Sequence, residues 1–213
     1  MNFDGITLGH SESIKILGVH VDRHLCWDKQ VSAVAQRCNG TVATIRKLNV
    51  PRETTKHLME SLMFPMIRYC LPVWAPKTQI LRNRIEKVLN FAVRTVTGLK
   101  KYDHVSQART ELGWVTFEAM IKLRDVQRIY HMMWNDEGSE RLKSLIERRS
   151  EVSLRSTRAS NDETVLHTGR CRLQATMSSF PHRAVATWNS LPSSVIRCSA
   201  ARFKKESQAC PSV

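Results

Sequence analysis

Adjacent carboxylates are the residues of this chain whose type and spacing could hold a pair of metal ions. The two candidate pairs are Asp136-Glu137 and Asp162-Glu163, and the sequence contains no Asp-Asp. Two-metal chemistry requires carboxylates that are fixed on rigid neighbouring elements. Both pairs lie instead in stretches with the composition of turns or linkers. We therefore interpret them as solvated loop charges and predict that the chain has no catalytic residues and no cofactor.

Histidine and cysteine supply the other common metal ligands. His20, His24 and Cys26 lie close together in the sequence, whereas Cys171 and His182 are isolated. A structural zinc site combines four such ligands, usually as two closely spaced pairs, and no second cluster has that spacing. Chance proximity is the simpler interpretation, so we predict no metal site. The six cysteines are far apart, and we expect free thiols that are mostly buried.

Positive charge is the strongest compositional feature. The chain has 213 residues and a formal net charge of +14, and residues 28–134 carry 18 basic against 8 acidic residues. A basic field of this size favours polyanions, either nucleic acid or an anionic membrane surface. The alternative is a basic protein whose charge serves only solubility.

Residues 77–97 form the clearest amphipathic helix in the sequence. Its basic residues Lys77, Arg84, Lys87 and Arg94 fall on a sector beside the apolar one, and Lys100 and Lys101 follow the expected stop at Gly98. These six residues could follow the phosphates of a nucleic acid. The alternative is that they are ordinary solvated charges, since cations near a helix C-terminus also interact favourably with the helix dipole.

Apolar residues recur at helical spacing through most of the chain, so we predict a mainly α fold. The first helix spans residues 29–48, with Gly40 indicating a bend or a close contact, and a later helix spans residues 117–134. We expect Pro65 to kink or break the second helix. The expected N-caps are Asp28, Asp103 and Ser139, with a further cap, Ser199, in the tail.

Residues 150–170 change in composition to Ser, Thr, Asn, Asp and Arg, which is typical of a polar linker. The tail that follows, residues 171–213, has signals for short helices that start at Phe180 and stop at Pro192. Its large apolar residues either dock on the helical body or stack on bases, and docking is the simpler interpretation. They are Phe180, Trp188, Leu191 and Phe203.

The N-terminal residues have the alternation and composition of β-strands. We expect residues 3–8 to pair with residues 14–21 as a hairpin, because the residues between them favour a turn. Two strands alone are marginally stable in water, and everything after Trp27 reads as helix or loop. The hairpin therefore has the character of the edge of a larger sheet, as if the sequence began in the middle of a domain.

The order of several short motifs resembles the C-terminal part of the reverse transcriptases of non-LTR (LINE-type, Jockey-like) retrotransposons. The first motif is Lys15 to Asp22, followed by Leu25 and Trp27. The others are Pro65-Met66-Ile67-Arg68-Tyr69-Cys70, Val73-Trp74, Arg94-x-x-x-Gly98, Glu111-Leu112-Gly113-Trp114 and Trp188-Asn189-Ser190-Leu191-Pro192. The resemblance covers essentially the whole chain.

The resemblance implies a domain organisation. Residues 1–27 would be the end of the palm, a hairpin that grips the primer through Leu17, Gly18 and Val19. Residues 28–149 would be a helical thumb-like region, residues 150–170 a linker and residues 171–213 a C-terminal tail. Gly18 could let a primer backbone approach closely, and a bulge or tight packing is an equal alternative. The aromatic-x-Asp-Asp motif that holds Mg²⁺ in this family is absent from the sequence.

These observations lead to two hypotheses. In the first, the chain is a non-catalytic fragment of an RNA-directed DNA polymerase that lacks its palm and fingers half and binds RNA or RNA–DNA duplex without sequence specificity. We would then expect an intracellular, nuclear protein with no membrane contact. In the alternative, the chain is a basic helical module for protein interaction with no nucleic-acid role.

Overall fold

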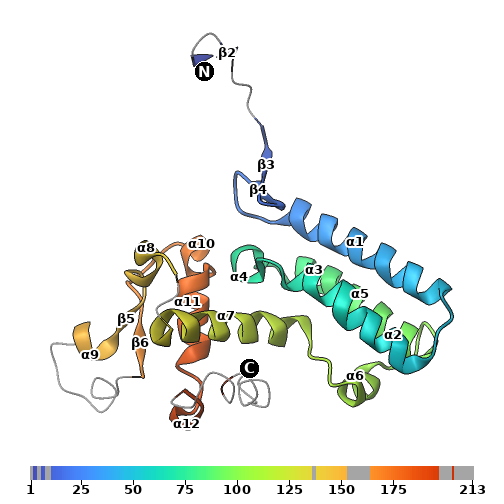
Figure 1. Cartoon of the computed structure of the whole chain (residues 1–213). Helices are drawn as coiled ribbons and strands as arrows, with labels where there is room; N and C mark the ends of the chain where they lie inside the picture. Colours follow the sequence, from blue (N-terminus) through green and yellow to red (C-terminus); the bar gives the residue numbers. More distant parts are fainter. Residues whose placement is uncertain are drawn as a thin grey trace. The chain divides into compact units, whose positions relative to one another are not determined.

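The computed structural model is mainly α-helical, with short antiparallel hairpins near the N-terminus, which confirms the predicted fold class. It describes residues 2–3, 6–7, 11–135, 138–152, 164–196 and 203. The chain divides into two compact units, Met1–Phe117 and Glu118–Val213 (Figure 1). The thumb-like span predicted for residues 28–149 therefore extends over parts of both units.

Unit 1 begins with two hairpins where the sequence predicted one. The strands are β1 (Asn2–Phe3), β2 (Ile6–Thr7), β3 (Ser13–Ile16) and β4 (Val19–Asp22). β1 pairs with β2, and β3 pairs with β4. The expected pairing of residues 3–8 with residues 14–21 is therefore wrong. Each sheet formed by the described residues contains two strands.

A tight turn at Leu17 and Gly18 explains the second hairpin. Both residues have positive φ, 46° and 85° respectively. A two-residue turn with two positive φ angles matches the twist of the strands that flank it. Residues 14–21 therefore fold back on themselves within one short segment instead of continuing as a single strand.

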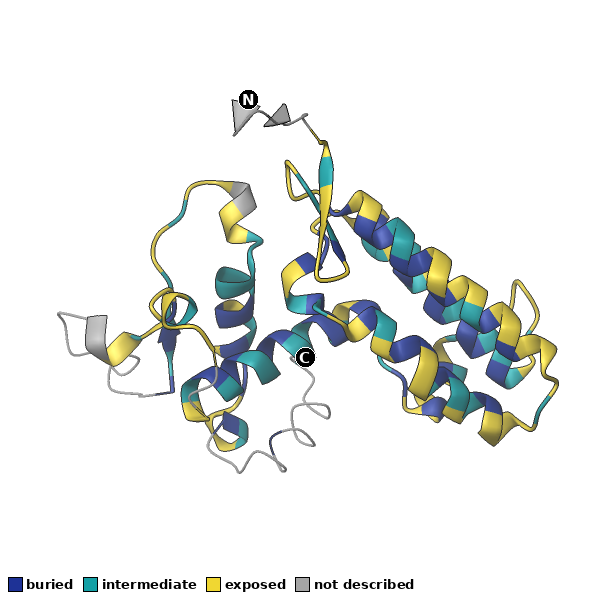
Figure 2. Ribbon diagram, turned by 45° about the horizontal axis from the view of Figure 1, so that its top comes forward, coloured by how far each residue is buried: buried dark blue, intermediate teal, exposed yellow. Residues whose placement is uncertain are grey.

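The rest of unit 1 is helical and is built on two long helices. Its elements are α1 (Asp28–Lys47), α2 (Arg52–Leu58), the π-helical turn η1 (Met59–Met63), α3 (Phe64–Arg68), α4 (Leu71–Trp74), α5 (Gln79–Thr97) and α6 (Ser106–Leu112). α1 and α5 pack side by side (Figure 1). Their predicted apolar stripes are buried, which places the core of the unit between them. Buried and exposed positions alternate along both helices (Figure 2).

Pro65 interrupts the second helix as predicted, and the form of the interruption is a π turn. Pro65 stands in the first turn of α3, where a missing N–H costs little. The preceding turn, η1, has the wider π geometry. Of the apolar residues here, Met59 and Met63 are fully buried, but Leu62 is 50% exposed. The apolar sector of this helix is wider than the part of it that α1 and α5 cover.

Two predicted N-caps have other roles. Asp28 is the first residue of α1 and pairs with Arg84, while Trp27 occupies the cap position with a φ of 67°. The Asp103 carboxylate accepts a hydrogen bond from the Lys100 backbone N–H at 2.8 Å, so it closes a loop and does not cap α6. The cap position of α1 thus lies one residue before Asp28, and the cap position of α6, Val105, lies two residues after Asp103. Ser139 does cap its helix, accepting the Leu142 N–H.

A buried polar group holds α6 and the end of unit 1 against α5. The Arg109 side chain, of which 9% is exposed, pairs with Glu86 and also donates to Asn90. The second oxygen of Glu86 accepts the Phe117 N–H at 2.9 Å. Trp114 donates from its indole to Glu60 at 2.9 Å. The charges of Arg109 and Glu86 therefore pair with each other, as buried charges require, while the buried Nε atom of Arg109 has no hydrogen-bond partner.

Unit 2 consists of one long helix and several short elements. They are α7 (Phe117–Trp134, whose first residue belongs to unit 1), α8 (Glu140–Lys143), β5 (Glu147–Arg148), α9 (Arg149–Val152), β6 (Leu166–His167), α10 (Gln174–Met177), α11 (Phe180–Trp188) and α12 (Ser193–Ile196). β5 pairs with β6. Part of the polar linker predicted at residues 150–170 thus takes part in a two-stranded sheet.

The tail docks on α7 through its aromatic residues. Trp188, Leu191 and Phe203 are buried in one cluster with Ile129 and Tyr130 of α7, and Phe180 packs against the edge of this cluster. The Trp188 indole donates to the Thr164 carbonyl at 2.9 Å. These contacts confirm the docking interpretation. Ser199, the predicted last cap, lies outside the described residues.

A buried ion pair adds to this docking. The Arg183 guanidinium of α11 forms two hydrogen bonds with the Asp125 carboxylate of α7, at 2.5 and 3.0 Å, and Asp125 is completely buried. Arg183 also donates to the Ser178 carbonyl. Both charges are therefore matched within unit 2.

Among the described residues, no helix is long and apolar enough to cross a membrane.

Candidate nucleic-acid interface

The predicted basic residues of the α5 region separate into two groups in the structure. Lys77, Lys87, Lys100 and Lys101 are exposed. Arg84 is engaged within the chain: its guanidinium lies 2.9 Å from the Asp28 carboxylate and 2.7 Å from the Ser32 hydroxyl of α1. Arg84 thus holds α5 against α1, and a phosphate would have to compete with an existing ion pair.

A basic pocket lies at the C-terminal end of α5. It has a volume of about 490 Å³ and is lined by four cationic residues, Arg46, Arg94, Lys100 and Lys101, together with Phe91, Thr95, Gly98 and Leu99. All of these residues are described, and none is a carboxylate. The structure therefore brings three of the six predicted residues together, and leaves Lys77 and Lys87 elsewhere on the unit.

The loop at residues 98–103 shapes the pocket. Gly98 ends α5 with a φ of 72°, the left-handed geometry expected of a glycine at this position. The Arg94 guanidinium then donates to the Lys100 and Asp103 carbonyls, each at 3.1 Å. Since these bonds hold the loop to the helix, Arg94 acts mainly as a positioning residue. Lys100 and Lys101 are the exposed cations that it positions.

Arg46 and Tyr102 are members of this region that the sequence argument missed. Arg46 comes from the last turn of α1, and its place in the pocket follows from the packing of α1 on α5, which no local pattern reveals. Tyr102 is 87% exposed, and the Lys101 ammonium lies 5.4 Å from the centre of its ring. The available signal was a tyrosine directly after two lysines, a combination suited to stacking on a base.

The predicted primer-grip residues form the tip of the β3–β4 hairpin. Leu17 is 85% exposed in spite of its apolar side chain, and Val19 is buried. The Tyr69 hydroxyl, at the end of α3, donates to the Leu17 carbonyl at 2.8 Å. A side-chain hydrogen bond with Cys70 and the charge of Cys70 raise the pKa of Tyr69 above its usual range. Figure 2 shows that β3 and this turn are largely exposed.

Asp22 joins this hairpin to α1 as a turn residue. Its carboxylate accepts the backbone N–H groups of His24, Cys26 and Trp27, at 3.1, 2.9 and 2.8 Å. Burial acts to raise the pKa of Asp22, but these hydrogen bonds outweigh burial and hold the pKa below its usual range. The hairpin is anchored from both ends, by Asp22 and by Tyr69.

The other candidate chemistries gain little from the structure. Asp136-Glu137 and Asp162-Glu163 lie outside the described residues. Among the residues that are described, no three His, Cys, Asp or Glu side chains gather as a metal site. Cys171 and His182, which look isolated in the sequence, come within 3.9 Å of each other. The Thr168 hydroxyl lies closer to the same nitrogen, Nδ1 of His182, at 2.9 Å. The hydroxyl, and not the Cys171 thiol, is therefore the nearer hydrogen-bond partner of that nitrogen.

Comparison with protein-family models, curated proteins and solved structures finds no match.

Proposed function

We propose that this chain binds nucleic-acid duplex through the phosphate backbone, as the non-catalytic C-terminal part of a reverse transcriptase of the non-LTR retrotransposon type. Its substrate would be the RNA or RNA–DNA duplex of template and primer, bound without sequence specificity. The proposal assigns no catalytic residue and no cofactor to the chain. The palm and fingers half of such an enzyme would be its natural partner, and the nucleus its location.

The basic pocket is the observation that carries this proposal. Helix C-terminal charge compensation accounts for each cation separately, for Arg46 at the end of α1 and for Lys100 and Lys101 after α5. It does not account for their convergence on one pocket. Cations from two elements that converge on one concave surface make an environment in which a phosphate can replace several water molecules at once. Phosphate contacts of this kind supply affinity and register without reading sequence.

The hairpin tip supports the proposal in a different way. An apolar side chain with positive φ is strained, and Leu17 is exposed as well. The bond from Tyr69 holds Leu17 in this exposed position, which suits the Leu17 side chain for contact with a bound ligand. We assign to Leu17 and Gly18 a non-ionic contact with the sugar–phosphate backbone.

Salt dependence of binding tests the proposal. Fluorescence anisotropy of a labelled RNA–DNA hybrid should show affinity that falls steeply with NaCl, because each phosphate contact releases counterions. The double substitution Arg46→Gln/Lys101→Gln should weaken binding about tenfold or more at low salt. It should also reduce the slope of log K against log[salt] by roughly two, one for each lost contact.

The matched control is Arg23→Gln/Arg52→Gln, which removes the same net charge at exposed residues outside the pocket. Under the proposal it leaves the salt slope nearly unchanged. Equal effects of the two double variants would show that only net charge matters. Absence of measurable binding by folded, monodisperse protein at low salt would reject the nucleic-acid role altogether.

A further inference from the structure

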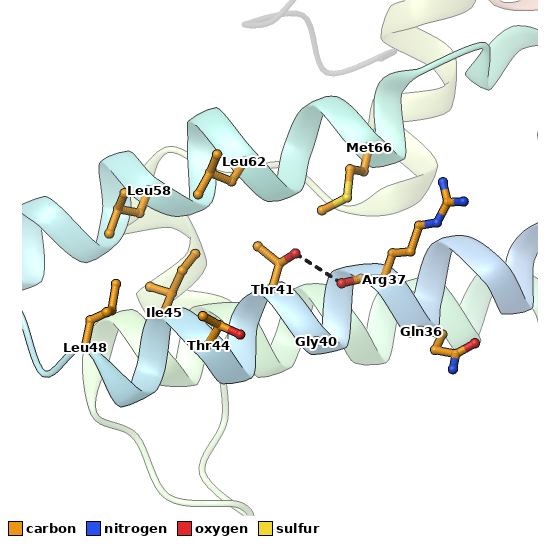
Figure 3. Close-up of a pocket in the computed structure, with 10 residues that line it drawn as sticks. All are labelled: Gln36, Arg37, Gly40, Thr41, Thr44, Ile45, Leu48, Leu58, Leu62 and Met66. Atoms are coloured by element: carbon orange, nitrogen blue, oxygen red, sulfur yellow. Dashed lines mark hydrogen bonds between the residues drawn. The ribbon is translucent and has the colours of Figure 1, made fainter. Parts of the chain in front are cut away.

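A groove runs along α1 on the side of α2, η1 and α3. It has a volume of about 550 Å³, and one wall is the apolar stripe Leu58, Leu62 and Met66 (Figure 3). Ile45 and Leu48 contribute apolar surface from α1. Leu62 is 50% exposed and Leu48 is 54% exposed. Exposed leucines that share one concave surface differ from single leucines scattered over a surface, which need no explanation.

The floor of the groove is made of small residues of α1, and Gly40 is the most informative. Gly40 lies within an unbroken helix, and a Cβ built on it would meet nothing within 4 Å. A mid-helix glycine is less favourable for helix stability than alanine. The sequence suggested a bend or a close contact, and the described chain supplies no close contact. Together with Thr41 and Thr44, Gly40 leaves room for an approaching backbone.

The charges of the groove are of one sign. Arg37 lines it near Met66, and the described lining residues include no carboxylate. Lys47 follows Gly40 and Thr44 at the helical spacing of one stripe, so a second exposed cation lies at the Leu48 end. Lys47 lies ten positions after Arg37, which is about 15 Å along the helix axis. A second copy of this chain, with a net charge of +14, would meet like charge here.

We propose that this groove binds an acidic amphipathic helix of a partner protein. Leucine-sized residues at i, i+4 and i+7 of the partner would lie against Leu58 and Leu62, which is how helices bind in apolar grooves. Acidic residues roughly three turns apart would pair with Arg37 and Lys47. The floor at Gly40 would allow the partner backbone to approach α1. This inference rests on the groove alone and does not depend on nucleic-acid binding.

A designed peptide tests the proposal on the full chain. The probe is a fluorescein-labelled helical peptide of about five turns, made of Ala, Gln, Leu and Glu, with leucines along one face and glutamates toward both ends. Anisotropy should show saturable binding. Gly40→Leu should weaken it at least tenfold by filling the floor, while the fold is kept because the added side chain meets open space and leucine favours helix.

The matched control is Asn39→Leu, which adds the same side chain one residue away, at an exposed position outside the groove. It should leave peptide affinity unchanged. Gly40→Leu should in turn leave binding of the RNA–DNA hybrid unchanged, so failure here and failure of the proposed function give different results.

Two further peptides separate the contributions. Leucine-to-serine replacement should abolish binding, and glutamate-to-lysine replacement should weaken it strongly. Three results would each overturn the proposal: equal binding of the serine peptide, no effect of Gly40→Leu, or no binding at about 100 μM peptide. A dimer in sedimentation that Gly40→Leu dissociates would assign the groove to a second copy instead, and loss of flotation with phosphatidylserine vesicles in the same variant would assign it to a membrane surface.

Discussion

Asp22 shows how one side chain can determine where a hairpin ends and a helix begins. Leu25 and Trp27 both have positive φ, 52° and 67°, a conformation that non-glycine residues rarely adopt without support. The Asp22 carboxylate supplies that support by accepting three N–H groups of this segment. Aspartate favours such local bonds in turns, but the sequence could not show how many N–H groups converge on Asp22.

Asp22→Asn should destabilise the protein by about 1 kcal/mol at pH 7, because the amide has one acceptor oxygen where the carboxylate has two. The folded pKa of Asp22 lies below the ordinary 3.8. The contribution of the carboxylate is therefore complete above the unfolded pKa and is lost as the pH falls through the folded pKa. The difference in thermal midpoint between wild type and variant should shrink on going from pH 7 to about pH 3. Glu12→Gln, at a highly exposed side chain, is the control, and a difference that stays constant with pH would contradict the argument.

At the scale of elements, periodicity predicted the long helices well and strand pairing poorly. The stripes of α1, α5 and α7 follow from the spacing of apolar residues, and their burial agrees. The β3–β4 hairpin depends on a turn at Leu17, a residue that turn preferences do not favour. The π turn before Pro65 could not be found from a 3.6-residue periodicity either, because its backbone hydrogen bonds span five residues instead of four.

Tyr69→Phe tests whether the hairpin tip is held from α3. Loss of the bond to the Leu17 carbonyl should raise amide hydrogen exchange across residues 13–22, with a global loss of less than about 1 kcal/mol, because water replaces the hydroxyl at this exposed site. Tyr102→Phe removes a hydroxyl from an exposed tyrosine remote from the hairpin in sequence and should leave this exchange unchanged. Unaltered protection in Tyr69→Phe would mean that pairing of β3 with β4 alone fixes the tip.

The ion pair between α7 and α11 allows a similar test in unit 2. Asp125→Asn leaves the Arg183 charge without its carboxylate and should cost about 3–5 kcal/mol in equilibrium unfolding followed by circular dichroism. The double variant Asp125→Leu/Arg183→Met should recover a large part of that loss, since it buries no charge. A double variant as unstable as Asp125→Asn would show that shape, not charge, limits this contact.

At the scale of the whole molecule, the sequence predicted the class of fold better than its division. The tail's aromatic residues were expected to dock, and Trp188 and Phe203 do so. The unit boundary falls after Phe117, the first residue of α7. The amino-acid composition does not change at this point, because the boundary depends on which residues α7 contacts and not on a linker. The candidate site was half predictable for the same reason: Lys100 and Lys101 follow a visible helix end, but Arg46 reaches them only through tertiary packing.

The burial of one thiol has a practical consequence. Cys38 of α1 is completely buried, and its thiol lies 3.9 Å from the Met63 carbonyl of η1. Burial, slightly opposed by the charge of Arg37, raises the pKa of Cys38 to about 12. Only a thiolate attacks alkylating reagents readily, so Cys38 is chemically silent while its surroundings stay closed. Cys26 is exposed and should be alkylated without any opening of the fold, so it serves as an internal reference for the reaction. The delay between alkylation of Cys26 and alkylation of Cys38 therefore reports how often the packing around Cys38 opens locally, without an introduced label.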